Sequence, residues 1–166
     1  MKPKSIFLIV LSILIMSFST VAVYAKSNSV VIEATTTLNN TPDFMISIPT
    51  VIPMEDIQRT AESSVKSKSF SVKLNDAEGL DGKQVDVFVQ TPGGSFDLYC
   101  DVYRLPYQLF NQADGGTPLA SGDLFASFTQ SGEVMGRVEV DEMNIPATGT
   151  YSGSLQFLVT VKDKAS

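Results

Sequence analysis

The chain of 166 residues contains no histidine, no tryptophan and a single cysteine. Without histidine there is no imidazole base, which excludes a Ser-His-Asp triad and a Cys-His pair. One cysteine excludes an internal disulfide, and it also excludes a zinc or iron–sulfur site built from several cysteines. These absences remove the residue sets on which many small enzymes depend, so we expect a protein without enzymatic activity and without a cofactor.

The N-terminal segment has the three parts of a secretory signal peptide. Lys2 and Lys4 precede an apolar stretch over 6–18, and Ala25 supplies the small residue of a cleavage site. We expect residues 1–25 to be removed after Ala25. Cleavage after Ala22 and retention of the segment as a membrane anchor are the two alternatives.

Residues 26–166 then form one domain outside the cell, long enough to bury a single hydrophobic core. They hold ten basic and 18 acidic residues, a net charge of −8. Nucleic acids and anionic lipids bind clustered cations, so this charge balance disfavours both as partners. Contact with a membrane is expected only through the N-terminal segment, if it is retained.

Alternation of apolar and polar residues with a period of two dominates this part of the chain and is typical of β-strands. Glycine, proline, asparagine and aspartate cluster between the alternating stretches and indicate turns. This pattern predicts an all-β protein, an antiparallel β-sandwich of about seven to nine strands. The nine stretches are 30–37, 44–48, 70–74, 84–90, 96–103, 107–110, 124–129, 134–140 and 155–161.

The inward faces of these strands predict the core, which consists of Val72, Leu74, Val85, Val87, Val89, Leu98, Phe125 or its neighbours, Leu155, Phe157 and Val159. Residues 54–68 do not follow the alternation. Their apolar residues have helical spacing, so a short helix and a loop are both open for this segment. Cys100 shares the apolar face of the strand predicted over 96–103, which places it toward the core.

Two groups of residues are candidate binding sites. Tyr99, Tyr103 and Tyr107 alternate with charged residues, and exposed aromatic side chains on a sheet can bind sugars or a protein partner. Carboxylates close together in a loop can hold calcium, a hard cation that prefers oxygen ligands. The residues of this weaker, calcium-binding candidate are Asn75, Asp76, Glu78 and Asp81.

The C-terminal segment 149–161 resembles the final strand of small secreted and cell-wall-associated proteins of Gram-positive bacteria, with the pattern Gly-x-Tyr-x-Gly-x-Leu-x-Phe-x-Val/Ile-x-Val. The segments 44–49 and 82–87 resemble the early and middle strands of these proteins. The tail also distantly resembles the C-terminal motif of WxL surface domains, Tyr-x-x-x-Leu-x-Trp-x-Leu. Tyr151 and Leu155 match that motif, and Phe157 and Val159 occupy its last two positions.

The resemblance implies a secreted, non-catalytic β-sandwich with Ig-like or WxL-like topology that is associated with the cell surface. Our first hypothesis is therefore an extracellular cell-surface or matrix protein that acts by binding or assembly. Its expected partner is a cell-wall component, a glycan or a surface protein, with self-assembly as an alternative. A second is a fibre or pilus-type subunit in which the strand over 30–37 complements the next protomer. A third is a carbohydrate-binding module that uses the three tyrosines, and a small secreted hydrolase is the last.

Overall fold

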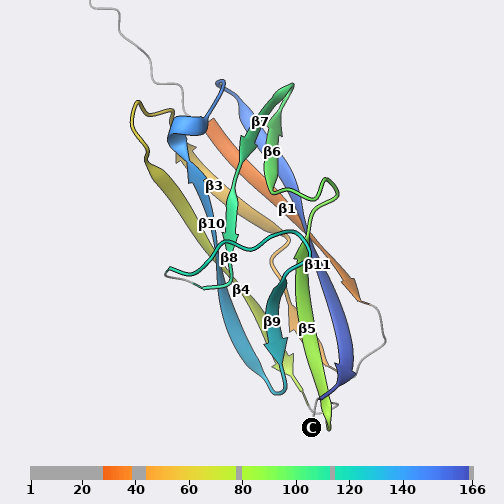
Figure 1. Ribbon diagram of the computed structural model, residues 1–166. Helices are drawn as coiled ribbons and strands as arrows, with labels where there is room; N and C mark the ends of the chain where they lie inside the picture. Colours follow the sequence, from red (N-terminus) through yellow and green to blue (C-terminus); the bar gives the residue numbers. More distant parts are fainter. Residues whose placement is uncertain (1–27, 39–43, 78–79, 113–114, 165–166) are drawn as a thin grey trace, which may run out of the picture.

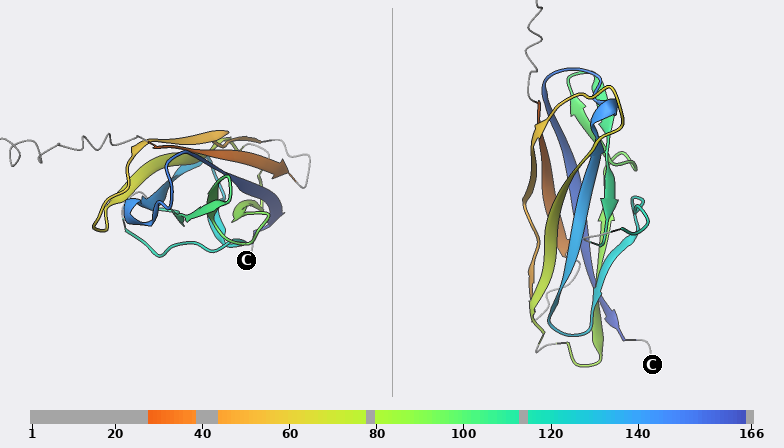
Figure 2. Two further views of the ribbon diagram at one scale, coloured as in Figure 1. Left: turned by 90° about the horizontal axis from the view of Figure 1, so that it is seen from above. Right: turned by 90° about the vertical axis from the view of Figure 1, so that its left-hand side faces the viewer.

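The computed structural model describes residues 28–38, 44–77, 80–112 and 115–164, which fold into two β-sheets packed face to face (Figures 1 and 2). This confirms the all-β sandwich. Within the described ranges the only helical element is a single 3-10 turn, η1 (Glu142–Asn144). No helix in these ranges has the length and apolarity needed to cross a bilayer. The predicted signal segment, 1–25, lies outside the described residues, so its cleavage stays a prediction.

The larger sheet consists of β1 (Asn28–Leu38), β3 (Val51–Ile57), β5 (Lys83–Gln90), β6 (Asp97–Cys100), β7 (Tyr103–Pro106), β9 (Leu124–Phe128) and β11 (Thr150–Asp163). Its order is β3-β1-β11-β5-β9, with β6 paired to β11 and β7 paired to β6. The smaller sheet consists of β2 (Met45–Ser47), β4 (Val65–Asp76), β8 (Gln108–Phe110) and β10 (Gly132–Asp141), in the order β2-β4-β10-β8.

The first strand, β1, lies inside the larger sheet between β3 and β11. It runs parallel to β11, whereas the other described strand pairs are antiparallel. Its inward side chains Val30, Ile32 and Ala34 are buried in the core. The strand over 30–37 is thus paired within its own chain. Donating β1 to a neighbour, as the fibre hypothesis requires, would detach β3 and expose these three core side chains.

The core fills the space between the sheets. All ten predicted core residues are buried, which confirms the alternation from which they were derived. Phe70 of β4, Phe125 of β9 and Phe157 of β11 form an aromatic cluster at its centre, with ring centroids 5.6 to 6.1 Å apart. Rings at these distances attract one another beyond the contribution of their buried area.

Gly136 of β10 faces this aromatic cluster. A Cβ atom at position 136 would lie 2.5 Å from Cζ of Phe70 and 2.7 Å from Cζ of Phe125. No carbon atom can approach another so closely without a shift of the surroundings. Because Gly136 has no side chain, the rings of Phe70 and Phe125 can fill the space beside it.

Of the two alternatives left open for residues 54–68, the helix is wrong and the loop is confirmed over 58–64. Residues 54–68 contain no helix: β3 covers 51–57 and a loop leads to β4. Ile52 and Met54 are both buried and alternate with Pro53, as in a β-strand. Because proline is rare inside strands, Pro53 made this strand hard to recognise in the sequence. The predicted strand over 96–103 is a hairpin, because the chain reverses at Asp101, whose φ is 56°. Within the described ranges, β3 and the division of this predicted strand into β6 and β7 raise the number of strands to eleven.

The hairpin changes the surroundings of the residues near its tip. Val102, expected to face inward, lies at the turn and is 81% exposed. Cys100 is half-buried and packs against the core and Gly149, as expected for a free cysteine in a strand.

The described sheet edges carry features that oppose pairing with another chain. Pro53 is exposed in the edge strand β3, and Lys66 and Lys68 lie where β4 extends beyond β2. Proline and lysine are residues with which natural proteins protect open edges. On the other side of the sandwich, the Asn111 side-chain amide donates a hydrogen bond to the Phe125 carbonyl oxygen of β9 at 3.3 Å.

Tyr151, at the start of β11, fixes the loop that precedes this strand. Its buried hydroxyl donates a hydrogen bond to the carbonyl oxygen of Ala147 at 2.7 Å and accepts one from the Ala147 amide at 3.1 Å. The arrangement resembles the tyrosine corner of β-sandwiches, in which a tyrosine near a strand start bonds to the backbone a few residues upstream.

Gly136→Ala is expected to lower the free energy of unfolding by about 1–3 kcal/mol, because the added methyl group overpacks the aromatic cluster. Urea denaturation measures the change. Gly132→Ala is the matched control in the same strand, since its Cβ would be 3.8 Å from the nearest atom. Equal stability of the two variants would contradict the packing argument.

Tyr151→Phe is expected to cost about 1–3 kcal/mol of stability, because the Ala147 amide and carbonyl lose their side-chain partner while the ring stays buried. Thermal and urea unfolding test this expectation. Tyr103→Phe serves as the control, because Tyr103 is exposed and its hydroxyl makes no such backbone bonds. A Tyr151→Phe protein as stable as the control would show that the two bonds contribute nothing.

Candidate functional site

A groove of about 350 Å³ lies on the outer face of the larger sheet. This volume is within the range of about 300–1,000 Å³ that small-molecule sites occupy. Three parts of the chain form it: β1, the loop between β5 and β6 with the following strand, and β11. We call it the Tyr99 groove, and its lining residues are Glu33, Thr91, Pro92, Gly93, Ser95, Asp97, Tyr99, Ser152, Gly153 and Ser154.

Strand register brings the groove together. Ser152 of β11 is paired with Tyr99 of β6, and Ser154 of β11 is paired with Glu33 of β1. Residues paired across strands project from the same face of a sheet. Tyr99 and Glu33 therefore stand on the two sides of a floor made of small residues, and the floor is low because serine and glycine have little side-chain volume.

Gly153 sets how closely β6 approaches this floor. A Cβ atom at position 153 would lie 2.7 Å from the carbonyl oxygen of Asp97 and 2.9 Å from Cδ2 of Leu98. Any other residue would push β6 away from β11. The sequence Ser152-Gly153-Ser154 thus positions Tyr99 through its backbone as well as forming the floor.

The buried carboxylate of Asp97 anchors the loop between β5 and β6, which forms one side of the groove. Oδ1 of Asp97 lies 2.6 Å from Nε of Arg104, and Oδ2 accepts a hydrogen bond from the Ser95 hydroxyl at 2.7 Å. The Thr91 hydroxyl donates to the Ser95 carbonyl oxygen at 2.9 Å, which closes the loop on itself. The hydrogen bond and the charge of Asp97 raise the pKa of the Arg104 guanidinium.

The remaining groups of the groove are available to a ligand. The side chain of Tyr99 is 52% exposed, and Glu33, Ser152 and Ser154 are exposed as well. Within the described ranges, no lysine or arginine lines the groove. Asp97 is engaged by Arg104, so the groove does not present the two free carboxylates that glycoside hydrolysis requires. Its chemistry is that of a binding surface: one aromatic face, two hydroxyls and one free carboxylate.

The three tyrosines expected to share one face are separated in the structure. Tyr99 faces the groove, whereas Tyr103 pairs with Cys100 and projects from the opposite face of the β6–β7 hairpin, where it is 45% exposed. Tyr107 is only 5% exposed and packs on Phe96 with ring centroids 5.4 Å apart. Burial raises its pKa, with a further contribution from the charge of Asp97. A single tyrosine surface is therefore wrong, because the turn at Asp101 interrupts the alternation.

Sequence reasoning identified Tyr99 but missed Glu33, Ser152 and Ser154. These residues come from strands near opposite ends of the chain, and only the pairing of β1 with β11 places them together. One signal for them existed in the sequence. The run of small residues at 152–154, within a strand of otherwise larger side chains, indicates a depression in the sheet surface.

The loop predicted to bind calcium lies at the other end of the sandwich. Asn75, Asp76 and Asp81 line an open hollow of about 730 Å³ together with Lys83 and Lys164, while Glu78 is outside the described residues. The Asn75 side-chain amide donates a hydrogen bond to the Ser47 hydroxyl at 2.6 Å. In the part of the chain that the structure describes, no three acidic or cysteine residues converge as a metal site. Calcium binding stays a prediction.

A second buried carboxylate, Asp86, lies on the same sheet face but outside the groove. It accepts hydrogen bonds from Gln84 at 2.7 Å and Ser127 at 2.8 Å, and Oδ2 is 2.5 Å from Nζ of Lys162. Burial raises the pKa of Asp86, but the hydrogen bonds and the charge of Lys162 outweigh it and hold the pKa below its ordinary value. Asp86 is thus fully engaged within the fold, and its role is structural.

No family model and no curated protein matches the chain. Ten chains of solved structures match it. One belongs to a chaperone–tip adhesin complex of CFA/I fimbriae, with a TM-score of 0.49 and 15% identity over 74% of this chain and 42% of that one.

Two further structures are of CfaE, the adhesive subunit of the CFA/I fimbria of enterotoxigenic E. coli. A mutant form has a TM-score of 0.34 and 13% identity over 80% of this chain and 47% of that one. The other form has a TM-score of 0.30 and 10% identity over 80% and 46%. The chain thus spans less than half the length of these three proteins. Likeness at this level carries no argument about the chain, so its function is argued from its own residues.

Asp86→Asn is expected to lower the free energy of unfolding at neutral pH by about 1–2 kcal/mol. Because the pKa of Asp86 is lower in the folded protein, its carboxylate stabilises the fold above the unfolded pKa of about 3.9. That contribution is lost as the pH falls through the folded pKa. Urea unfolding across the acid range should therefore show a shallower loss of stability for the variant than for the wild type.

The control for this titration is Asp163→Asn, which changes an exposed carboxylate at the end of β11. Its free energy of unfolding at neutral pH should stay close to that of the wild type. If Asp86→Asn and the wild type lose stability equally between neutral and acid pH, Asp86 does not have the lowered pKa that its contacts indicate.

Proposed function

We propose that this protein is a non-catalytic extracellular binding protein that holds a carbohydrate in the Tyr99 groove. The observation that carries the proposal is the half-exposed ring of Tyr99 beside a floor of small hydroxyl-bearing residues. A sugar ring has an apolar face of C–H groups and an edge of hydroxyls. The first matches the face of an aromatic ring, and the second matches serine hydroxyls and a carboxylate.

The groove is suited to holding a ligand in a defined orientation. Tyr99 sits on a paired strand, Gly153 fixes its distance from β11, and the Asp97–Arg104 ion pair anchors the neighbouring loop. Binding sites whose residues are fixed in advance lose less conformational entropy when the ligand arrives. The sandwich thus supplies a rigid support for a small number of contacts.

Three features of the sequence support this proposal: the predicted signal segment, the net charge and the resemblance to surface proteins. The predicted signal segment supports an extracellular location, and the net negative charge disfavours nucleic acids as partners. The resemblance to Gram-positive surface proteins and WxL domains supports a cell-surface setting, in which cell-wall glycans are available as ligands. Assembly into fibres by donation of β1 is not part of the proposal, because β1 is a central strand of its own sheet.

Tyr99→Ala is expected to weaken glycan binding about tenfold, the effect of removing a central aromatic contact from a binding site. A glycan array identifies ligands of the wild-type protein, and calorimetry of the best ligand measures the affinity of each variant. Both experiments use the protein without its predicted signal segment, as secreted.

Tyr103→Ala is the matched control, because it removes a similarly exposed tyrosine from the opposite face of the same hairpin. It should bind glycans as the wild type does. Equal losses in the two variants would point to a general disturbance of the hairpin. Absence of glycan binding, or unchanged binding by Tyr99→Ala, would reject the groove as a carbohydrate site.

A further inference from the structure

The Tyr99 groove is lined by acidic side chains and carries a net negative charge. Two carboxylates line it, Glu33 and Asp97, and no basic side chain among the described residues does. Asp97 is neutralised by Arg104, whose guanidinium contacts it at 2.6 Å. Glu33 therefore supplies the net charge of the groove.

No neighbouring residue compensates the charge of Glu33. Its direct cross-strand partners are Ser154 on β11 and Val51 on β3, and neither is charged. Within the described residues Glu33 takes part in no ion pair, and its side chain is exposed. An uncompensated carboxylate beside a groove attracts a cation and repels an anion.

From this arrangement we propose that the Tyr99 groove selects sugars that carry a protonated amine over neutral and acidic sugars. The proposal rests on the carbohydrate-binding function proposed above and names its ligand class. The ammonium group of such a sugar would pair with the carboxylate of Glu33 while the sugar ring stacks on Tyr99.

The second side of the groove favours the same ligand. The face of an aromatic ring carries partial negative charge, so a cation near Tyr99 is attracted as well. Among the described residues, the cation close to Tyr99 is Arg104, which is paired with Tyr99 across the β6–β7 hairpin and is engaged by Asp97. Arg104 is thus not free to pair with the carboxylate of an acidic sugar.

Three oligosaccharides of equal length test this preference, because they share a β-1,4-linked glucose backbone and differ only at C2. Cello-oligosaccharides have a hydroxyl there, chito-oligosaccharides an acetylated amine, and chitosan oligosaccharides a free amine. An oligogalacturonate supplies the acidic sugar. Below the pKa of the sugar amine, we expect the chitosan oligosaccharide to bind about two- to fivefold more tightly than its acetylated counterpart. The acidic sugar should bind most weakly.

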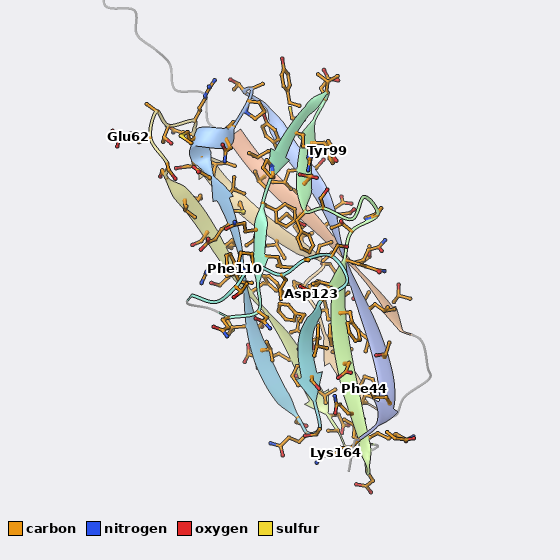
Figure 3. All side chains as sticks on the ribbon, viewed as in Figure 1. Phe44, Glu62, Tyr99, Phe110, Asp123 and Lys164 are labelled. Carbon is orange, nitrogen blue, oxygen red and sulfur yellow. The ribbon has the colours of Figure 1, made fainter. Side chains whose placement is uncertain are left out.

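Three changes should reduce this advantage of the free amine. High salt screens the attraction, and a pH above the pKa of the sugar amine removes its charge. Glu33→Gln removes the carboxylate with little change in shape, so the ratio of the two affinities should fall to about one. The control, Glu62→Gln, removes an exposed acid from a loop remote from Tyr99 (Figure 3) and should preserve the ratio.

The outcomes separate the two proposals. If neither the glycan array nor these four sugars show binding, the carbohydrate function and the ligand class both fail. If the array finds ligands but none of the four sugars binds, the function stands and the ligand class fails. If neutral and amine-bearing sugars bind equally, or if Glu33→Gln retains the full preference, the function stands and the selection by Glu33 is overturned. Equal loss of the preference in Glu33→Gln and Glu62→Gln would also overturn it, because the general negative charge of the protein would then be the cause.

Discussion

The parallel ladder between β1 and β11 is the interaction on which the larger sheet depends. β3 is joined to the sheet only through β1, while β5 and β6 are both joined to it through β11. The two strands come from opposite ends of the described chain, so their pairing closes a loop of more than a hundred residues. Contacts of such long range are slow to form, since the entropy of loop closure is lost before the ladder stabilises the fold.

The same ladder assembles the groove. Glu33 and Ser154 are direct partners in it, and Tyr99 reaches the groove because β6 pairs with the next stretch of β11. The side chains of the groove therefore come together only when β1 and β6 have both paired with β11. A protein built in this way couples binding to global stability, because no local segment can present Tyr99 and Glu33 to a ligand on its own.

Much of the fold could be predicted from residue alternation. Val85, Val87 and Val89 alternate with polar residues, and this pattern gave both the strand and its inward face. The prediction of strands failed at two positions where a single residue decides whether the chain continues or turns. Pro53 has the character of a strand breaker but stands in an edge strand, where proline is tolerated. Asp101 adopts a positive φ, which is uncommon outside glycine. Because no glycine marks this position, the turn could not be recognised in the sequence.

The site was less predictable than the fold for a physical reason. Tyr99 could be selected from the sequence because exposed aromatic side chains are typical of binding sites. The contribution of Ser152 and Ser154 to the groove depends instead on which strands lie beside β11. The pairing of β1 with β11 joins strands more than a hundred residues apart, so neighbouring residues in the sequence do not indicate it. The ion pair of Asp97 with Arg104 likewise depends on the hairpin that brings β6 against β7.

The long strands of the sandwich also have a mechanical consequence. Tyr99 lies toward one end of the molecule and Lys164 at the other, and β11 runs from the groove floor almost to Lys164 (Figure 3). Tension between a ligand in the groove and an attachment beyond Lys164 would pull along β11. The hydrogen bonds of β11 to β1 and β5 run across this direction, so the load is shared among them in shear. Rupture then requires many bonds to break together instead of one after another.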